Sequence, residues 1–120
     1  MRFLSWITAI NVLVASGFAV VGVVAPQAFL PGSITTDASR LFAMYAATRI
    51  IPLAFVVLAV IYKRSTSGLF ILGILAGIIQ FADAGVGFYL HDLGKTVGPL
   101  VIALIQFYAV FVFHKPSSTR

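Results

Sequence analysis

The sequence predicts an all-α membrane protein, with four transmembrane helices in an antiparallel bundle. Of its 120 residues, 61% are hydrophobic and 9% are charged, which is far from the composition of soluble domains. The apolar residues gather in four stretches of about 18 to 23 residues, each long enough to cross a hydrocarbon layer of about 30 Å. The stretches do not alternate strictly and are about twice as long as barrel strands, which excludes a β-barrel.

We expect one domain over residues 1–120, because the chain has room for a single bundle. The predicted helices cover about residues 5–25, 41–62, 68–90 and 96–113.

The first helix needs one check, because Met1 and Arg2 before an apolar run also describe a signal peptide. The run is longer than the usual apolar region of about 7–15 residues in such peptides. Asn11 interrupts it, and Pro26 follows it at a poor place for cleavage. We therefore expect the segment to be retained as a spanning helix.

The second helix follows the longest connection, PQAFLPGSITTDAS, in which Pro31-Gly32 is a turn signal. Thr35, Thr36 or Asp37 can cap the helix start. The apolar residues 28–30 could fold over the bundle as a lid, or the segment could be a plain connector with an aromatic anchor.

The third helix carries small and polar residues on one face, and Gly73 with Gly77 forms a GxxxG pair that allows close helix packing. The first helix has a similar stripe that includes Asn11. HDLGK joins the third helix to the fourth, where Pro99 falls in the first turn and its missing N–H costs little.

The charges predict that both termini lie in the cytoplasm. Four crossings place the termini on one side, and that side then carries five bases and no acid, namely Arg2, Lys63, Arg64, Lys115 and Arg120. The loops on the other side hold two bases and two acids. The net charge of +5 therefore reports the positive-inside pattern of a multi-pass protein of a plasma or inner membrane, and does not indicate a nucleic-acid partner. Binding of anionic membrane lipid by these bases is the alternative.

Two opposite charges interrupt the apolar helices, Arg49 in the second and Asp83 in the third. Counted from Leu41 and Leu90 as the outer helix ends, they lie roughly 12 Å and 10 Å below the outer surface. An isolated charge inside a membrane costs on the order of 2.5–3.5 kcal/mol, whereas two paired charges offset each other's desolvation. We therefore predict that Arg49 and Asp83 form a buried salt bridge, which either fixes helix register or belongs to a functional pocket.

Other polar side chains are predicted near this pair. Asn11 is expected in the inner half of the bundle, hydrogen-bonded to a neighbouring helix rather than reaching the pair. We take seven residues as candidate ligand-binding residues beside Asp83 and Arg49 as candidate catalytic ones: Tyr45, Thr48, Gln80, Gln106, Tyr89, His91 and Asn11.

Several chemistries are excluded by the sequence. The chain has no cysteine, its two histidines fall at opposite ends of the bundle, and it has no glycine-rich phosphate loop. We predict no metal and no cofactor. With an arginine beside it, Asp83 would be ionised and could serve as a base or a counter-ion.

The segments MYAATRIIPLAF (44–55) and QFADAGVGFYL (80–90) resemble the small four-helix DoxX-like membrane proteins and related uncharacterised families. The resemblance implies a compact four-helix bundle and points to Arg49 and Asp83. Small multidrug exporters have the same size, but their pattern needs a glutamate in the first helix, and this chain has no glutamate.

The function predicted first is binding of a lipophilic small molecule in an intramembrane pocket. Arg49 would anchor a carbonyl or anionic group, and acid/base turnover of the isomerase, cyclase or hydrolase type stays open. Ion-coupled transport or a channel, and a structural subunit of a membrane complex, are the alternatives. Membrane lipid is an expected partner, with a homo-oligomer or a partner membrane subunit left open.

Overall fold

A computed structural model describes residues 2–29 and 31–114. It contains four long helices, α1 (Arg2–Val24), α2 (Asp37–Tyr62), α3 (Thr66–Tyr89) and α4 (Leu93–His114), and a short 3₁₀ helix, η1 (Pro26–Ala28). Each long helix is long and apolar enough to cross a membrane. The prediction of four transmembrane helices is confirmed in this sense, whereas Leu30, Lys115 and Arg120 lie outside the described residues.

Local sequence signals explain the helix starts. Thr36 caps α2 through a reciprocal pair of hydrogen bonds with Ser39, so α2 begins at Asp37, four residues before the predicted start. Ser65 caps α3 by accepting a hydrogen bond from the Gly68 N–H. Because α2 begins earlier than predicted, Arg49 lies further from the start of its helix than the sequence indicates.

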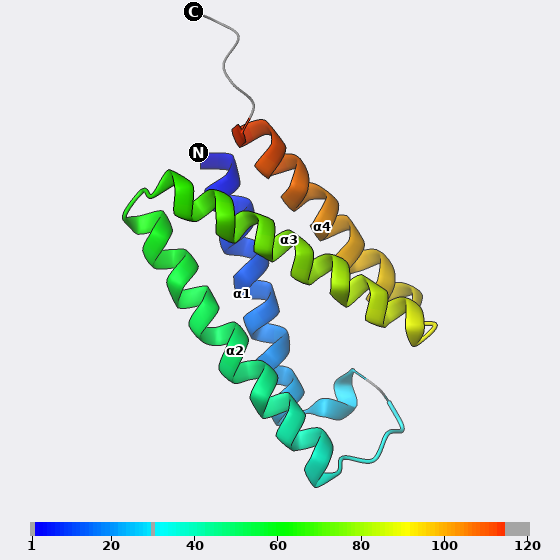
Figure 1. Cartoon of the computed structure of the whole chain (residues 1–120). Coiled ribbons are helices and arrows are strands. Elements are labelled where there is room, and N and C mark those ends of the chain that lie inside the picture. The colour runs from blue at the N-terminus through cyan, green and yellow to red at the C-terminus, as the bar shows by residue number, and fades with distance from the viewer. Residues whose placement is uncertain (1, 30, 115–120) are drawn as a thin grey trace, which may run out of the picture.

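The helices are arranged as two closely packed pairs, α1 with α2 and α3 with α4, whereas α2 and α3 have few contacts although a short turn joins them. Figure 1 shows the start of α1, the α2–α3 turn and the end of α4 at one end of the molecule, which we call the terminal end. The opposite end, with η1 and the α3–α4 turn, is called the loop end.

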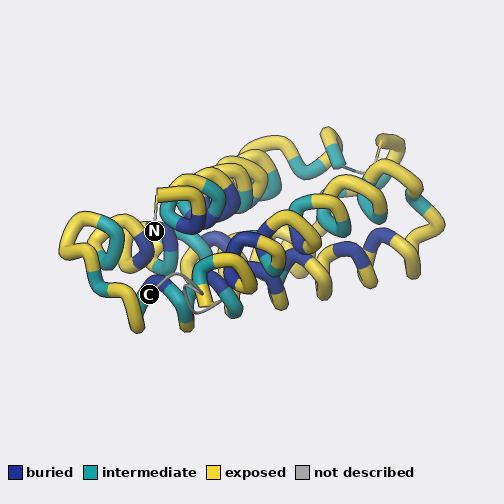
Figure 2. The backbone as a smooth tube through the Cα atoms, turned by 90° about the horizontal axis from the view of Figure 1, so that it is seen from above, coloured by how far each residue is buried: buried dark blue, intermediate teal, exposed yellow. Residues whose placement is uncertain are grey.

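The packed core lies toward the terminal end. Leu4, Leu69 and Val110 belong to one buried cluster, and Val12 and Val57 belong to a second. Figure 2 shows the buried residues on the helix faces that point toward other helices, with exposed residues on the outward faces. The outward faces carry large apolar side chains such as those expected to meet lipid.

Small residues allow α3 to approach α4 closely. A Cβ atom at Gly87 would overlap the carbonyl group of Lys95 and lie 2.6 Å from the Thr96 nitrogen, so the two backbones nearly touch there. At Gly77 a Cβ atom would lie 2.7 Å from the ring of Phe107. The close packing predicted for the GxxxG pair is therefore seen on this face, and the closest backbone approach lies further along, at Gly87.

Candidate functional site

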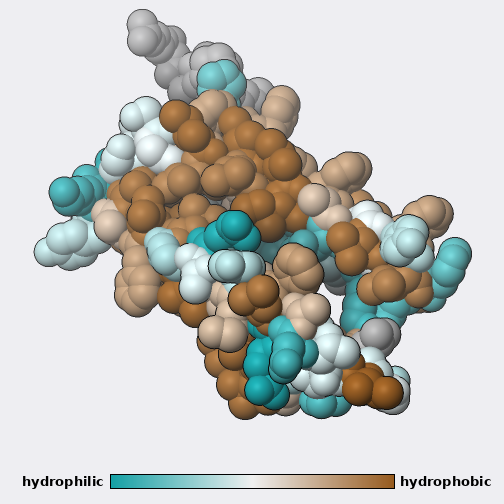
Figure 3. All heavy atoms as spheres, turned by 60° about the horizontal axis from the view of Figure 1, so that its bottom comes forward, coloured by the Kyte–Doolittle hydropathy of each residue, from teal (hydrophilic) through white to brown (hydrophobic). Residues whose placement is uncertain are grey.

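A half-open cavity of about 820 Å³ lies between the two helix pairs in the loop half of the molecule. All four helices line it, with residues from the ranges 14–22, 43–53, 79–90 and 94–102. Its volume is in the range of sites for small organic ligands, about 300–1,000 Å³. Seen toward the loop end, the surface is largely apolar, with hydrophilic residues gathered in places among it (Figure 3).

The cavity wall is mainly apolar, with Phe18, Leu53 and Ile79 among its residues. Toward the terminal end the two buried clusters fill the space between the helices. The cavity therefore lies in the loop half, and on its terminal side the described residues of the two clusters pack against one another.

Arg49 and Asp83 both line this cavity, but they do not form the predicted salt bridge. Both residues are exposed rather than buried. The ion pair found among residues 2–29 and 31–114 joins Lys95 to Asp92 instead. The prediction of a buried Arg49–Asp83 contact is wrong for this structure, although the two groups share one hollow.

The positions of Arg49 and Asp83 along their helices explain why the two side chains are not in contact. Counted from the α2–α3 turn, Arg49 lies thirteen residues before Tyr62 and Asp83 lies seventeen residues after Thr66. At about 1.5 Å per residue, Arg49 lies about 20 Å and Asp83 about 26 Å from this turn. Arg49 therefore lies about one helical turn nearer the terminal end than Asp83. The divergence of α2 from α3 adds a lateral separation.

Arg49 has an aromatic neighbour on its own helix. Its guanidinium carbon lies 5.7 Å from the centre of the Tyr45 ring, within the range of a cation–π contact. Such a contact leaves the N–H groups at the edge of the guanidinium free to bind an acceptor in the cavity.

A buried polar network lies beside the cavity and ties three helices together. Asn11 Nδ2 donates to Gln106 Oε1 (3.2 Å), Gln80 Nε2 donates to Asn11 Oδ1 (2.6 Å), and Gln106 Nε2 donates to Thr8 Oγ1 (2.8 Å). These four side chains are at most 4% exposed. Because a buried amide must be hydrogen-bonded, the network fixes α1 against α3 and α4.

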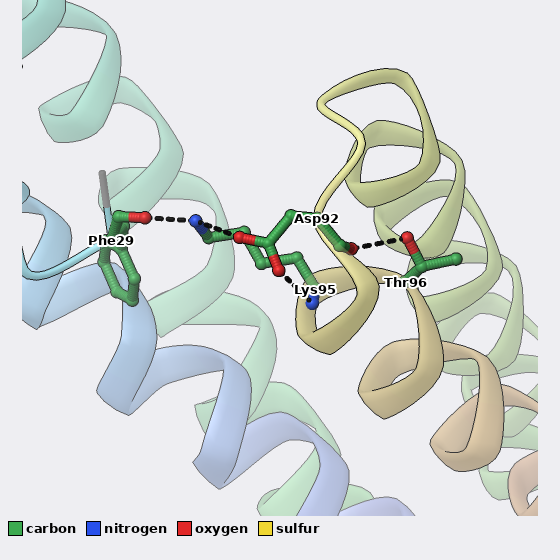
Figure 4. A network of polar contacts seen from close by, with 4 residues as sticks. All are labelled: Phe29, Asp92, Lys95 and Thr96. Atoms are coloured by element: carbon green, nitrogen blue, oxygen red, sulfur yellow. Dashed lines mark hydrogen bonds and ion pairs between the residues drawn. The ribbon is translucent and has the colours of Figure 1, made fainter. Parts of the chain in front are cut away.

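A second polar network crosses the loop end (Figure 4). The Lys95 ammonium donates to the backbone carbonyl of Phe29 and forms an ion pair with Asp92 at 2.9 Å. Phe29 packs on α1 against Phe18, with 5.6 Å between ring centres. Phe29 and Lys95 both line the cavity, so this bridge joins the two helix pairs at its edge.

The side-chain hydrogen bond from Lys95 holds the pKa of Asp92 below its ordinary value of 3.8. Backbone hydrogen bonding from the Lys95 N–H, at 3.0 Å, acts in the same direction. Asp92 is therefore ionised at neutral pH and holds the ammonium group of Lys95 at the cavity edge.

The candidate residues fall into distinct places. Asp83, Arg49 and Gln80 line the cavity. Gln106 and Asn11 lie in the buried network, and Asn11 hydrogen-bonds to neighbouring helices as predicted. The remaining four are exposed and lie outside the cavity lining, namely Tyr45, Thr48, Tyr89 and His91.

Sequence reasoning assigned no binding role to Lys95 or Phe29. In the sequence Lys95 is one of the loop charges, and its four-carbon stem, which lets it reach across the cavity edge, is the feature that indicates this contact. The sequence predicts Phe29 as part of a lid or as an aromatic anchor, and the structure places its carbonyl beside the Lys95 ammonium. Thr8 was recognisable from its spacing to Asn11 on one face of the first helix.

The described residues hold no cluster of three or more His, Asp or Glu side chains that could bind a metal ion. The polar groups that line the cavity are the Arg49 guanidinium, the Asp83 carboxylate, the Gln80 amide and the Lys95 ammonium, among mainly apolar side chains. Comparison with family models, with curated proteins and with solved structures found no match.

Proposed function

We propose that this multi-pass membrane protein binds a lipophilic small molecule in the cavity between its two helix pairs. The observation that carries the proposal is an apolar hollow of about 820 Å³ into which one guanidinium and one carboxylate face without contacting each other. Ligand sites combine apolar walls with a few polar groups that orient the ligand. Intramembrane ionisable groups are functional candidates by default.

Each polar group has a role in this proposal. Arg49 binds a carbonyl or anionic group of the ligand, because its planar guanidinium suits oxygen acceptors. Asp83 serves as the counter-ion for a cationic group or as a base toward an acidic proton. Gln80, held by Asn11, supports the site between α1 and α3. Turnover by isomerase-, cyclase- or hydrolase-type chemistry would use Asp83 as the base.

The proposal includes an orientation in the membrane. Consecutive helices would run antiparallel with both termini in the cytoplasm, which places the loop end and the cavity on the outer side. The support is the excess of bases at the terminal end, including Arg2, Lys63 and Arg64. A ligand would then reach the cavity from the outer half of a plasma or inner membrane.

The alternatives receive less support. A carrier or channel needs a polar path across the whole membrane, whereas apolar clusters fill the terminal half of the described bundle. A purely structural role for Arg49 and Asp83 needs a contact between them, and the polar network of Asn11 joins the helices instead. The resemblance to DoxX-like proteins stays a prediction and points to the same two charges.

The experiment is mass spectrometry of the lipophiles that co-purify with the protein, with a variant that fills the cavity. Ala46 lines the cavity and Ala59 is exposed on the same helix outside it. We expect a molecule bound to the wild type and to Ala59→Trp to be lost from Ala46→Trp. Retention by Ala46→Trp at the wild-type level, or no bound molecule in the wild type, would overturn the proposal.

A further inference from the structure

The cavity holds two opposite charges that lack a protein partner among the described residues. Arg49 contacts the Tyr45 ring but no carboxylate, and Asp83 takes part in no hydrogen bond or ion pair found within residues 2–29 and 31–114. The third charged residue of the lining, Lys95, is already neutralised by Asp92. The unpaired charges of the cavity therefore sum to zero, with one of each sign.

Such an arrangement favours a ligand that is itself neutral overall and carries both signs. A singly anionic ligand would bind Arg49 but bring a like charge toward Asp83, and an uncharged ligand would leave both groups unpaired inside the membrane. A ligand with both charges satisfies both residues at once.

We propose that the cavity takes a zwitterionic amphiphile, with its anionic group on Arg49 and its cationic group on Asp83. This inference rests on the proposed function and names its ligand class. An aminophospholipid headgroup, in which a short ethylene link joins phosphate and ammonium, has this chemistry. The planar guanidinium of Arg49 binds phosphate oxygens in a bidentate manner.

The depths of the two charges fit this ligand. Arg49 lies about one turn nearer the terminal end than Asp83, so the phosphate sits deeper and the ammonium group sits nearer the loop end. Leu53 and Ile79 lie beyond the pair in the apolar part of the lining, where the acyl chains leave the phosphate. The headgroup then points to the loop end and the chains point to the middle of the membrane, as in a lipid of that leaflet.

The test compares three lipids with identical acyl chains, phosphatidylethanolamine, phosphatidylglycerol and diacylglycerol, by native mass spectrometry of the delipidated protein. We expect the wild type to retain phosphatidylethanolamine roughly tenfold better than phosphatidylglycerol, since one charge-assisted interaction separates them. Diacylglycerol should bind more weakly still. Soluble phosphoethanolamine should not displace the lipid, because it lacks the chains that the apolar walls hold.

Two variants test which residue binds the anionic group of the lipid and which binds its cationic group. Asp83→Asn should abolish the preference for phosphatidylethanolamine over phosphatidylglycerol, and Arg49→Met should weaken both phospholipids roughly tenfold. Arg40→Met and Asp37→Asn are matched controls, because both residues are exposed near the start of α2 and outside the cavity lining. If Arg49→Met does not fold, Arg49→Lys keeps the charge, and its loss of bidentate binding should still reduce phospholipid retention.

Equal retention of the two phospholipids by the wild type would overturn the inference, as would an unchanged preference in Asp83→Asn or displacement by soluble phosphoethanolamine. The proposed function can fail separately. Lipid retention that Ala46→Trp abolishes, without any headgroup preference, refutes the zwitterionic ligand and supports the cavity. Retention of none of the three lipids refutes the zwitterionic ligand, and the absence of any co-purified lipophile from the wild type refutes the proposed function itself.

Discussion

Two neighbouring helix interfaces, α3–α4 and α2–α3, differ sharply although short turns connect both. Along α3–α4 the helices pack closely, and at Gly87 the backbones nearly touch. Between α2 and α3 the contacts are few, and the space toward the loop end is the cavity. Sequence adjacency therefore brings two helices together at their shared turn, and small residues on the facing surfaces decide whether they stay together.

The same comparison separates two kinds of polar group. The amides of Asn11 and Gln106 join α1 to α4, across the two helix pairs, and they are buried and hydrogen-bonded to each other. Arg49 and Asp83 lie on helices that diverge, and they face the cavity. Buried and satisfied polar groups hold the bundle together, whereas unpaired groups facing a hollow are available to a ligand.

The largest effect is expected where α3 and α4 are closest. Gly87→Ala should lower the free energy of unfolding by about 1–3 kcal/mol, because the added methyl overlaps the Lys95 backbone. Gly85→Ala is the matched control, since a Cβ atom there meets nothing within 4 Å, and it should be neutral or stabilise by up to about 1 kcal/mol. Thermal unfolding in detergent, followed by circular dichroism, measures both. Equal effects of the two changes would show that the close α3–α4 approach is not formed.

A smaller effect is expected in the buried polar network. Gln106→Leu leaves Asn11 Nδ2 and Thr8 Oγ1 without that partner and should cost about 1–2 kcal/mol. Gln27→Leu removes an exposed hydrogen bond to Thr35 and should stay within about 0.5 kcal/mol of the wild type. A Gln106→Leu protein as stable as Gln27→Leu would show that the network does not hold the helices.

The smallest effect is expected at the loop end, from the Lys95–Asp92 pair. Because its folded pKa is lowered, Asp92 contributes stability above its unfolded pKa, and this contribution is lost as the pH falls through the folded pKa. The difference in melting temperature between wild type and Lys95→Met should therefore shrink between about pH 5 and about pH 2. Lys63→Met, an exposed lysine at the terminal end, should show no such trend. A difference that is constant with pH would contradict the ion pair.

Much of the fold could be predicted from the sequence, because length and hydropathy fix membrane-spanning helices within a few residues of their ends. The start of α2 was missed by four residues, since its first turn is polar and is set by the Thr36–Ser39 cap. That error placed Arg49 too near the loop end of its helix, and so at the level of Asp83. The hydrogen bonding of Asn11 to neighbouring helices was predictable from its position within an apolar stripe.

The contact between Arg49 and Asp83 could not be judged from sequence, because helix divergence is a property of the whole packing arrangement. The cavity was inferred from the same two charges, and the structure brings them to one hollow without joining them. Gln80 was predicted as a ligand residue, and it lines the cavity while also belonging to the buried network. The bridge from Lys95 to the Phe29 carbonyl joins segments far apart in sequence and leaves no pattern in either one.

A double-mutant cycle on lipid-free protein tests most directly whether Arg49 and Asp83 share a cavity without contacting each other. The unfolding free energies of Arg49→Met, Asp83→Leu and the double variant are compared with that of the wild type. The structure predicts additive effects, with a coupling energy below about 0.5 kcal/mol. A coupling of about 0.5–3 kcal/mol, with each single variant less stable than the double one, would show an ion pair and contradict this account.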